Sequence, residues 1–320
     1  MERPVGATLR LVITVVDPGP LSSVQDAAGR PGWRRYGVPV GGSADAWSAR
    51  LANLLVGNDE NAALIEITLG GARFGTDAAC LVAVTGGVSA VVDGLPLSTA
   101  EARPIRAGAT IALAFGDGAR GYLAVSGGLD VPPVLDGLGT DLRSAFGGHQ
   151  GRALRAGDHL PVGTVGSARR AAWRGRRADG PIRVMPGPHP DALMPLTEAE
   201  WIVGAQADRA GVRLDGPAIT GGETDSMGLP LGAIQVPPDG RPIVMLADRP
   251  VTGGYVVPAC VVASDVGRVA QMRTGDELRF RVVSAAEARK AWEQSEESLL
   301  LIDPIDPGDE ESLRWTGAHG

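Results

Sequence analysis

Glycine and proline divide this 320-residue chain into short apolar runs, and this division constrains its fold more than any other feature. The 46 glycines and 24 prolines are dispersed along the whole length. Runs such as Leu11–Val16, Thr110–Phe115 and Val256–Ala263 are rich in Val, Ile, Leu or aromatic residues and are bounded by Gly, Pro or Asp. Many short strands joined by turns are typical of barrels and sandwiches, so we predict a mainly β protein.

Few segments predict helices. Ser43 is a plausible N-cap for a helix with apolar residues at helical spacing, which Gly57 would end. Ser284 and Glu287 form a capping box before a second helix. A third helix is possible over Thr197–Gly204, which opens with a similar pattern. The chain is therefore expected to carry a few short helices on its strands.

The length exceeds one average domain, and a faint internal repeat supports two. The pattern V-x-P-G-P begins at Val16 and again at Val184, and R-x-G-D-x-L begins at Arg155 and at Arg273. An Arg- and Ala-rich stretch over Ser167–Gly180 lacks an apolar period and is typical of a linker. We predict domains over residues 8–170 and 180–290, followed by a C-terminal helix and flexible tail over 291–320, the acidic tail beginning at Ile302.

Charge and composition exclude several classes of function. The formal net charge of −7, with no basic run longer than Arg174–Arg177, argues against nucleic-acid binding. The apolar runs are too short to span a bilayer and no secretory signal is evident, so a cytoplasmic location is expected. Cys80 and Cys260 are then interpreted as buried free thiols, although a disulfide stays an alternative. Metal-binding spacings are absent, so no metal site is predicted.

The chain has a single lysine, Lys290. A Walker A lysine and a biotin-carrying M-K-M site are therefore both missing, and bound phosphates or carboxylates would need arginine side chains and backbone N–H groups. The segment Gly116–Gly121 matches the dinucleotide pattern G-x-G-x-x-G, but a strand-like run rather than a helix follows it, so we interpret it as a hairpin turn. His149 and His159 flank a turn. We interpret them as surface residues in preference to general bases.

The segment from Gly19 to Glu66 mixes glycines with polar residues that rarely serve a core, such as Gln25 and Asp26. Asp248 and Arg249 follow an apolar run, where binding sites commonly lie, and a second polar cluster surrounds Asp208. Ion pairs or turn caps would explain any one of these residues. Their clustering around Gly-rich loops favours a site, without naming a reaction.

Ordered motifs along nearly the whole chain resemble one family. They include Ser23-Val-Gln-Asp26, Leu51-Ala-Asn-Leu-Leu-Val-Gly-Asn58, Ser126-Gly-Gly-Leu-Asp130, Gly232-Ala-Ile-Gln-Val-Pro-Pro238 and Thr252-Gly-Gly-Tyr255. The family is that of the C subunit of bacterial 5-oxoprolinase, also labelled allophanate hydrolase subunit 2, KipA-like protein or biotin-dependent carboxyltransferase A/B domain.

The resemblance implies two tandem cyclophilin-like β-barrel domains. It also implies two partners, the B subunit (allophanate hydrolase subunit 1-like) and the A subunit of 5-oxoprolinase. Together such proteins open the lactam of 5-oxoproline to L-glutamate at the expense of ATP, which this chain or its partner subunits would bind. No covalent biotin is expected on this chain.

With the resemblance, the polar residues divide into two sides of one expected site. The residues of the opening segment would line one side, and those of the second half the other. The candidate catalytic carboxylates are Asp26, Asp45 and Asp248. The candidate substrate- or phosphate-binding residues are Gln25, Arg30, Arg209, Arg213, Gln235, Arg249 and Tyr255.

Two other functions stay open. The same domains occur in urea carboxylase and allophanate hydrolase-type systems, where they accept carboxybiotin, so the chain could be a carboxyltransferase component with a separate biotin carrier. Some relatives are non-catalytic regulators that bind an inhibitor of a sporulation kinase. A biotin carboxylase encoded nearby would favour the former, and recovery of only a kinase-inhibitor homologue would favour the latter.

Overall fold

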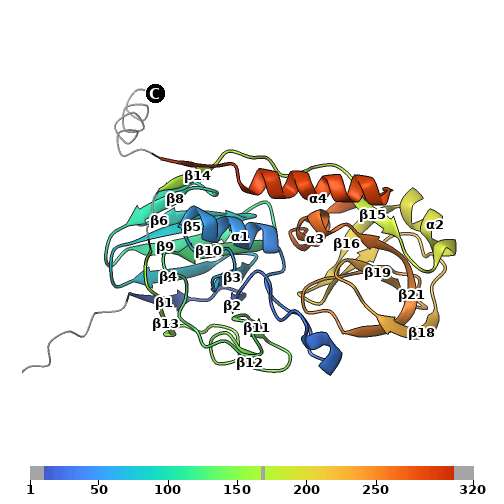
Figure 1. The fold of residues 1–320 in the computed structure, drawn as a ribbon, viewed down its shortest axis with the longest axis horizontal. Coiled ribbons are helices and arrows are strands. Elements are labelled where there is room, and N and C mark those ends of the chain that lie inside the picture. Colours follow the sequence, from blue (N-terminus) through green and yellow to red (C-terminus); the bar gives the residue numbers. More distant parts are fainter. Residues whose placement is uncertain (1–10, 167–169, 306–320) are drawn as a thin grey trace, which may run out of the picture.

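The computed structural model describes residues 11–166 and 170–305. It contains two β-rich halves with α4 (Ala285–Leu299) lying across both (Figure 1). The predicted mainly β class with a few short helices is confirmed. The division into domains over residues 8–170 and 180–290 is retained as a proposal.

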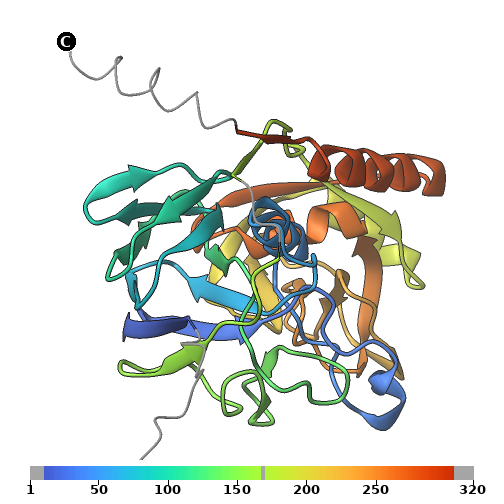
Figure 2. The same cartoon turned by 60° about the vertical axis from the view of Figure 1, so that its left-hand side comes forward.

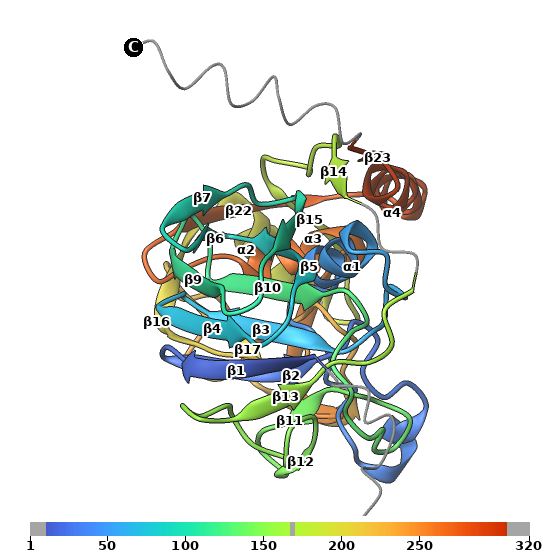
Figure 3. The same ribbon diagram turned by 90° about the vertical axis from the view of Figure 1, so that its left-hand side faces the viewer.

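The first half is built from two antiparallel sheets. One sheet has the strand order β13-β1-β4-β9-β6-β7, and the other has the order β2-β3-β10-β5-β8. Figure 3 shows both sheets. The strands of the first sheet are β1 (Val12–Asp17), β4 (Ala72–Thr76), β6 (Val88–Val92), β7 (Leu95–Leu97), β9 (Thr110–Phe115) and β13 (His159–Pro161). Those of the second are β2 (Leu21–Gln25), β3 (Leu64–Thr68), β5 (Cys80–Gly86), β8 (Ala102–Ile105) and β10 (Arg120–Val125), and a separate pair is β11 (Thr140–Asp141) with β12 (Phe146–Gly147).

The second half closes on itself. Its strands have the order β15-β22-β16-β17-β20-β19-β21, and β15 also pairs with β21, which completes a barrel; β18 extends from β21. Closure removes the edge strands that an open sheet exposes. The strands are β15 (Ile182–Pro186), β16 (Glu200–Ala207), β17 (Gly211–Asp215), β18 (Glu223–Gly228), β19 (Ala233–Val236), β20 (Ile243–Met245), β21 (Thr252–Val261) and β22 (Glu277–Val282).

The helices are α1 (Ala46–Leu55), α2 (Leu193–Glu198), α3 (Ala263–Ala270) and α4, with short 3₁₀ turns at η1 (Trp33–Tyr36) and η2 (Pro190–Ala192). The capping box of Ser284 and Glu287 is confirmed at the start of α4. The predicted N-cap Ser43 is wrong, since the Asp45 carboxylate caps α1 by accepting from the Ser48 N–H. Helices α1 and α3 contact one another between the halves (Figures 1 and 2).

The helix predicted over Thr197–Gly204 is also wrong, because most of that segment is strand β16. In β16, buried Trp201 and Val203 flank the exposed Ile202, which is the period of two that a strand requires. The preceding helix α2 ends at Glu198.

The C-terminal part of the described chain returns to the first half. α4 begins at Ala285, before the predicted boundary at 291. The prediction of flexibility from Ile302 is wrong for β23 (Ile302–Pro304), which pairs with β14 (Ala171–Trp173) of the linker; the rest of the predicted tail, 306–320, lies outside the described residues. Backbone pairing at β23 and the fully buried Leu299 therefore anchor this segment against the first half.

The internal repeat marks equivalent turns. In the first half the Arg155 N–H donates to Asp158 at 2.8 Å, and in the second the Arg273 N–H donates to Asp276 at 2.8 Å. Each turn precedes a strand, β13 or β22. The repeated letters thus specify one turn geometry used twice.

The segment Gly116–Gly121 joins two strands, as predicted, but they do not pair as a hairpin. β9 lies in one sheet and β10 in the other, so the segment is a corner between sheets. A Cβ at Gly118 would lie 2.5 Å from Oε1 of Gln271, which also accepts from the Arg120 N–H at 3.0 Å. Its glycines allow close approach of the second half instead of a cofactor.

Candidate active site at the junction of the two halves

Loops from both halves meet at Gly41. Its N–H donates to the carbonyl of Ala247 at 3.3 Å, which joins the loop before α1 to the loop after β20. Gly41 has φ +64°, and a Cβ added there would lie 3.4 Å from Arg30 Nη1 and 3.8 Å from Asp248 Oδ1. Glycine therefore lets two predicted site residues from different halves approach the same backbone position.

Arg30 is buried beneath the loop that follows β10 in the first half. Its Nε donates to the Val134 carbonyl at 3.0 Å, its Nη2 donates to the Gly139 carbonyl, and its guanidinium lies 4.7 Å from the Phe146 ring centroid. Burial lowers the pKa of Arg30, and the charges of Asp26, Asp141 and Asp248 partly offset this effect. A positive charge is thus fixed facing the second half.

Gln25 and Asp26 are fully buried beside Arg30. Asp26 accepts from the Gly29 N–H at 3.1 Å and, through its other oxygen, from the Leu138 N–H at 2.7 Å. Gln25 donates to the Thr140 carbonyl at 3.1 Å, while its Oε1 is buried and has no hydrogen-bond partner among the described residues. Both side chains therefore fix the loop that covers Arg30.

A buried ionic joint links the halves. Arg209 donates through Nη1 to Glu66 and through Nε, at 2.8 Å, to Asp248. Burial would lower the pKa of Arg209, but the two carboxylates outweigh it and raise that pKa. Burial would raise the pKa of Glu66, but Arg209 and Arg120 outweigh it and lower that pKa. The joint is therefore ionised on both sides of the junction.

Asp45 lies at a second joint. Its carboxylate, fully buried, accepts from Arg177 at 2.7 Å, from Gln271 at 2.9 Å and from the Ser48 hydroxyl at 2.7 Å. Burial alone would raise the pKa of Asp45, but Arg177, Gln271 and Ser48 together lower it. This carboxylate is committed to capping α1 and joining it to the linker and to α3.

Asp248 differs from the other two candidate carboxylates because 20% of its side chain is exposed. Burial raises the pKa of Asp248, with the charges of Glu66 and Asp141 adding to the effect, and Arg209 offsets it only in part. A carboxylate with a raised pKa and access to solvent has the properties of a general base.

Next to Asp248, Arg249 lines a cavity of about 270 Å³ at the junction, hereafter the junction cavity. Its walls come from residues 27–28, 40–47, the start of α3 and the α4 residues Trp292, Ser295 and Glu296. Arg249 is buried, and its Nε and Nη1 donate to the carbonyls of Leu229 (3.0 Å) and Leu246 (3.2 Å). Burial lowers the pKa of Arg249 to about 10, with the nearby charge of Arg34 adding to the effect.

Within the described ranges, Arg249 has no carboxylate partner. The cavity wall includes the first residues of α3, which begins after Val262 without a side-chain cap. Unpaired N–H groups at a helix start and an uncompensated guanidinium both favour an anion. The junction cavity can therefore bind a small carboxylate or phosphate.

Of the ten predicted site residues, Asp45 and Arg249 line the junction cavity. Asp248 and Arg30 approach it at Gly41 without lining it, whereas Arg213, Gln235 and Tyr255 lie elsewhere. Arg213 pairs with Asp239 at 2.9 Å on a partly exposed face of β17. Gln235 is buried on β19, and its Nε2 has no hydrogen-bond partner in the described part of the chain. Tyr255 is 37% exposed on β21, opposite Glu223 of β18.

The predicted set omitted several residues that complete the junction, among them Glu66 of the ionic joint and Trp292 of the cavity wall. Glu66 stood out in the sequence as a carboxylate within the strand-forming segment Leu64–Thr68. Trp292 lies on a capped helix with a 50% exposed side chain, and no local pattern connects it with residues 27–47.

The chain is similar to known proteins over most of its length. The family described as "Carboxyltransferase domain, subdomain A and B" matches residues 36–282. The C subunit of 5-oxoprolinase from Escherichia coli (strain K12) is 37% identical over 299 residues, 88% of this chain and 94% of that protein. The same subunit from Haemophilus influenzae is 33% identical over 92% of this chain and 97% of its own length. Urea amidolyase of Saccharomyces cerevisiae is 30% identical over 91% of this chain but only 18% of that protein.

The chain is also similar to solved structures. The crystal structure of TTHA0988 is 37% identical with a TM-score of 0.79 over 87% of this chain. This chain spans only 57% of that one. The Kluyveromyces lactis urea amidolyase has a TM-score of 0.83 at 28% identity, over 90% of this chain and 20% of its own. Across residues 11–166 and 170–305, no helix is long and apolar enough to cross a membrane.

Proposed function

This chain belongs to the family of the carboxyltransferase domain, subdomains A and B, and from that premise we propose that it is one component of a cytoplasmic, ATP-dependent 5-oxoprolinase. The B and A subunits of that enzyme would complete the hetero-oligomer that opens 5-oxoproline to L-glutamate. The observation that carries the proposal is Arg249, a buried guanidinium without a carboxylate partner in the described chain, on the wall of a cavity of about 270 Å³.

5-Oxoproline carries one carboxylate on a small ring, which suits such a cavity. In the proposed arrangement the carboxylate accepts from Arg249 and from the uncapped start of α3. The ring packs against the exposed Trp292 side chain at the cavity wall. Charge recognition at one end and an apolar contact at the other would orient the lactam.

Asp248 is the favoured general base among the three candidate carboxylates. Asp26 and Asp45 are fully buried, whereas Asp248 keeps a partly exposed side chain, although Arg209 donates to both of its oxygens. Its raised pKa brings it closer to the pH of the reaction, which favours proton transfer. Arg30, beside Gly41 with Asp248, would stabilise negative charge that develops nearby.

ATP supplies the energy to open a resonance-stabilised lactam. The junction cavity is smaller than the roughly 300–1,000 Å³ of typical pockets for drug-sized ligands, so it suits the lactam better than a whole nucleotide. We therefore propose that ATP binds with or on the partner subunits, and that this chain carries no covalent biotin.

The test is kinetic. Coexpressed with its two partner subunits, the complex should hydrolyse ATP only when 5-oxoproline is present, and Arg249→Met should raise the KM for 5-oxoproline. Arg213→Met, which removes an arginine from a distant face, is the matched control and should leave KM unchanged. If the complex is soluble and its rate of ATP hydrolysis does not depend on 5-oxoproline, the proposal is refuted.

The likeness to urea amidolyase favours a second candidate, a carboxyltransferase component that works with a separate biotin carrier. In that case the junction cavity would accept urea and carboxybiotin instead. Transfer of a labelled carboxyl group from a biotinylated carrier protein to urea, in the presence of this chain, would establish it. If no carboxyl group is transferred under those conditions, the lactam reaction stays the favoured function.

A further inference from the structure

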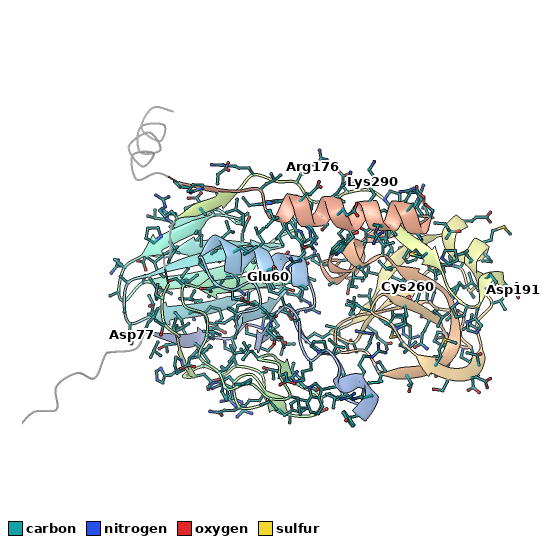
Figure 4. All side chains as sticks on the ribbon, in the orientation of Figure 1. Glu60, Asp77, Arg176, Asp191, Cys260 and Lys290 are labelled. Carbon is teal, nitrogen blue, oxygen red and sulfur yellow. The ribbon has the colours of Figure 1, made fainter. Side chains whose placement is uncertain are left out.

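A second cavity, about 260 Å³, lies beside the junction cavity. Trp47, Ser264 and Ser295 contribute to the walls of both. The remaining wall comes from the linker before β15, from α3 and from the outer part of α4, and Figure 4 shows Arg176 near α4 at the top of the molecule. Four arginines line this arginine cavity: Arg176, Arg177, Arg183 and Arg268.

The carboxylates that pair with these arginines leave donors unused. Arg183 holds Asp265 through Nε at 2.9 Å and through Nη2 at 2.5 Å, so its Nη1 has no hydrogen bond to the described residues. Nη1 of Arg268 is buried, lies 3.2 Å from an Asp265 oxygen and has no partner of hydrogen-bond geometry in the described chain. Two guanidiniums thus compete for one carboxylate and retain free N–H groups.

Two of the three acidic partners are fully buried, while the third, Asp179, lines the cavity itself and is 78% exposed. The Asp45 and Asp265 side chains are fully buried, whereas Arg177, Arg183 and Arg268 are 27%, 16% and 15% exposed. Arg176 is 82% exposed and pairs only with the exposed Asp179 across the described residues. A ligand in the cavity would therefore meet four guanidiniums and one exposed carboxylate, that of Asp179, while the carboxylates of Asp45 and Asp265 are buried.

We propose that the arginine cavity is a binding site for a phosphate group. A phosphate presents several acceptor oxygens and up to two negative charges, which matches the remaining N–H groups of several guanidiniums and the hydroxyl of Ser264. The site is separate from the carboxylate site at Arg249 and does not depend on the lactam reaction. The phosphate could be free inorganic phosphate or the phosphate chain of a nucleotide.

Binding there would join three segments that are far apart in sequence. Arg176 and Arg177 lie on the linker, Arg268 on α3, and Gln294 and Ser298 on α4. A phosphate shared between them would fix α4 against the junction and stabilise the folded chain by mass action. Because Trp47 lines the cavity, with Arg177 4.8 Å above its ring, binding should also change tryptophan fluorescence.

The experiment titrates the full chain with inorganic phosphate by calorimetry and by tryptophan fluorescence, at constant ionic strength. Gln294→Glu adds one negative charge to the cavity wall with almost no change of shape. Gln206→Glu makes the same change on the exposed part of β16, away from this cavity, and is the matched control. We expect saturable binding that Gln294→Glu weakens about tenfold and Gln206→Glu alters less than twofold.

A second variant, Arg176→Ala, removes an exposed cation without breaking a buried ion pair and should weaken binding about threefold. Tighter binding of ADP than of phosphate, with the same sensitivity to Gln294→Glu, would identify a nucleotide as the source. Equal affinities would identify free phosphate. No saturable binding of either ligand, or binding that Gln294→Glu leaves unchanged, would overturn the proposal.

Discussion

Arg209 and Arg249 are two buried arginines of the second half with opposite surroundings. Arg209 reaches into the first half and is compensated by Glu66 and Asp248. Among the described residues, Arg249 finds carbonyl acceptors alone, and it lines a cavity. A buried charge costs several kcal/mol unless it is paired, so the first arrangement joins the halves and the second leaves a charge for a ligand to neutralise.

The largest expected effect comes from breaking the compensated site. Arg209→Met would leave Glu66 and Asp248 buried without their cation, which should lower the free energy of unfolding by about 3–5 kcal/mol. Chemical denaturation followed by circular dichroism measures this. The double variant Arg209→Met with Glu66→Gln should recover part of the loss, and a loss below about 1 kcal/mol would contradict the role of the joint.

Removing the uncompensated charge should act on function instead. Arg249→Met should reduce kcat/KM for the substrate anion about 30- to 1,000-fold, because a desolvated charge contact typically contributes about 2–4 kcal/mol. The free energy of unfolding should change by no more than about 1–2 kcal/mol, because two carbonyls lose a donor while the cost of an unpaired buried charge is removed. Steady-state kinetics with denaturation of the same preparation separates the two effects, and a stability loss as large as that of Arg209→Met would refute the distinction.

Asp158 and Asp276 repeat the comparison at the equivalent turns. Both accept from a backbone N–H, but within residues 11–166 and 170–305 an arginine also holds Asp158 alone, namely Arg152 at 2.7 and 2.8 Å. We expect Asp158→Asn to lower the free energy of unfolding by about 1–2 kcal/mol and Asp276→Asn by about 0.5 kcal/mol. Thermal denaturation of both variants tests the order, and equal losses would show that the arginine adds nothing.

The ion pair of Asp158 and Arg152 also predicts that the free energy of unfolding depends on pH, with a smaller effect than the substitutions above. The hydrogen bonds from Arg152 lower the pKa of Asp158 to about 2 in the folded chain, below its ordinary value of 3.8. A carboxylate with a lowered folded-state pKa stabilises the protein above its unfolded pKa, and this stabilisation is lost as the pH falls from about 4 to 2. The stability difference between wild type and Asp158→Asn should therefore shrink over that range. A difference independent of pH would contradict the assignment.

Much of the fold could be predicted from local sequence. Apolar runs bounded by Gly, Pro or Asp marked strands correctly, as at β1 and β9, because burial and turns are local properties of a strand. β16 was mistaken for a helix because Thr197 and Glu200 have the spacing of a capping box. Closure of the barrel in the second half depends on the pairing of β15 with β21, which no local pattern encodes.

The candidate site was less predictable. Asp26, Asp45 and Asp248 are the same residue type beside Gly-rich loops, and nothing in their local sequence separates them. Their differences come from partners far away in the chain: Arg177 is 132 residues from Asp45, and Arg209 is 39 residues from Asp248. Residue type and clustering therefore indicated the region, while solvent exposure separated the candidate base from the fully buried carboxylates.

The position of α4 and β23 has a consequence for how the chain is made. Leu299 is fully buried in a cluster with α1 residues Leu51 and Leu55, and β23 pairs with the linker strand β14. The first half emerges first from the ribosome, yet part of its apolar surface stays uncovered until residues near 300 have been synthesised. Its last packing step must therefore wait until the whole second half has been synthesised, and the nascent chain carries an exposed patch for that interval.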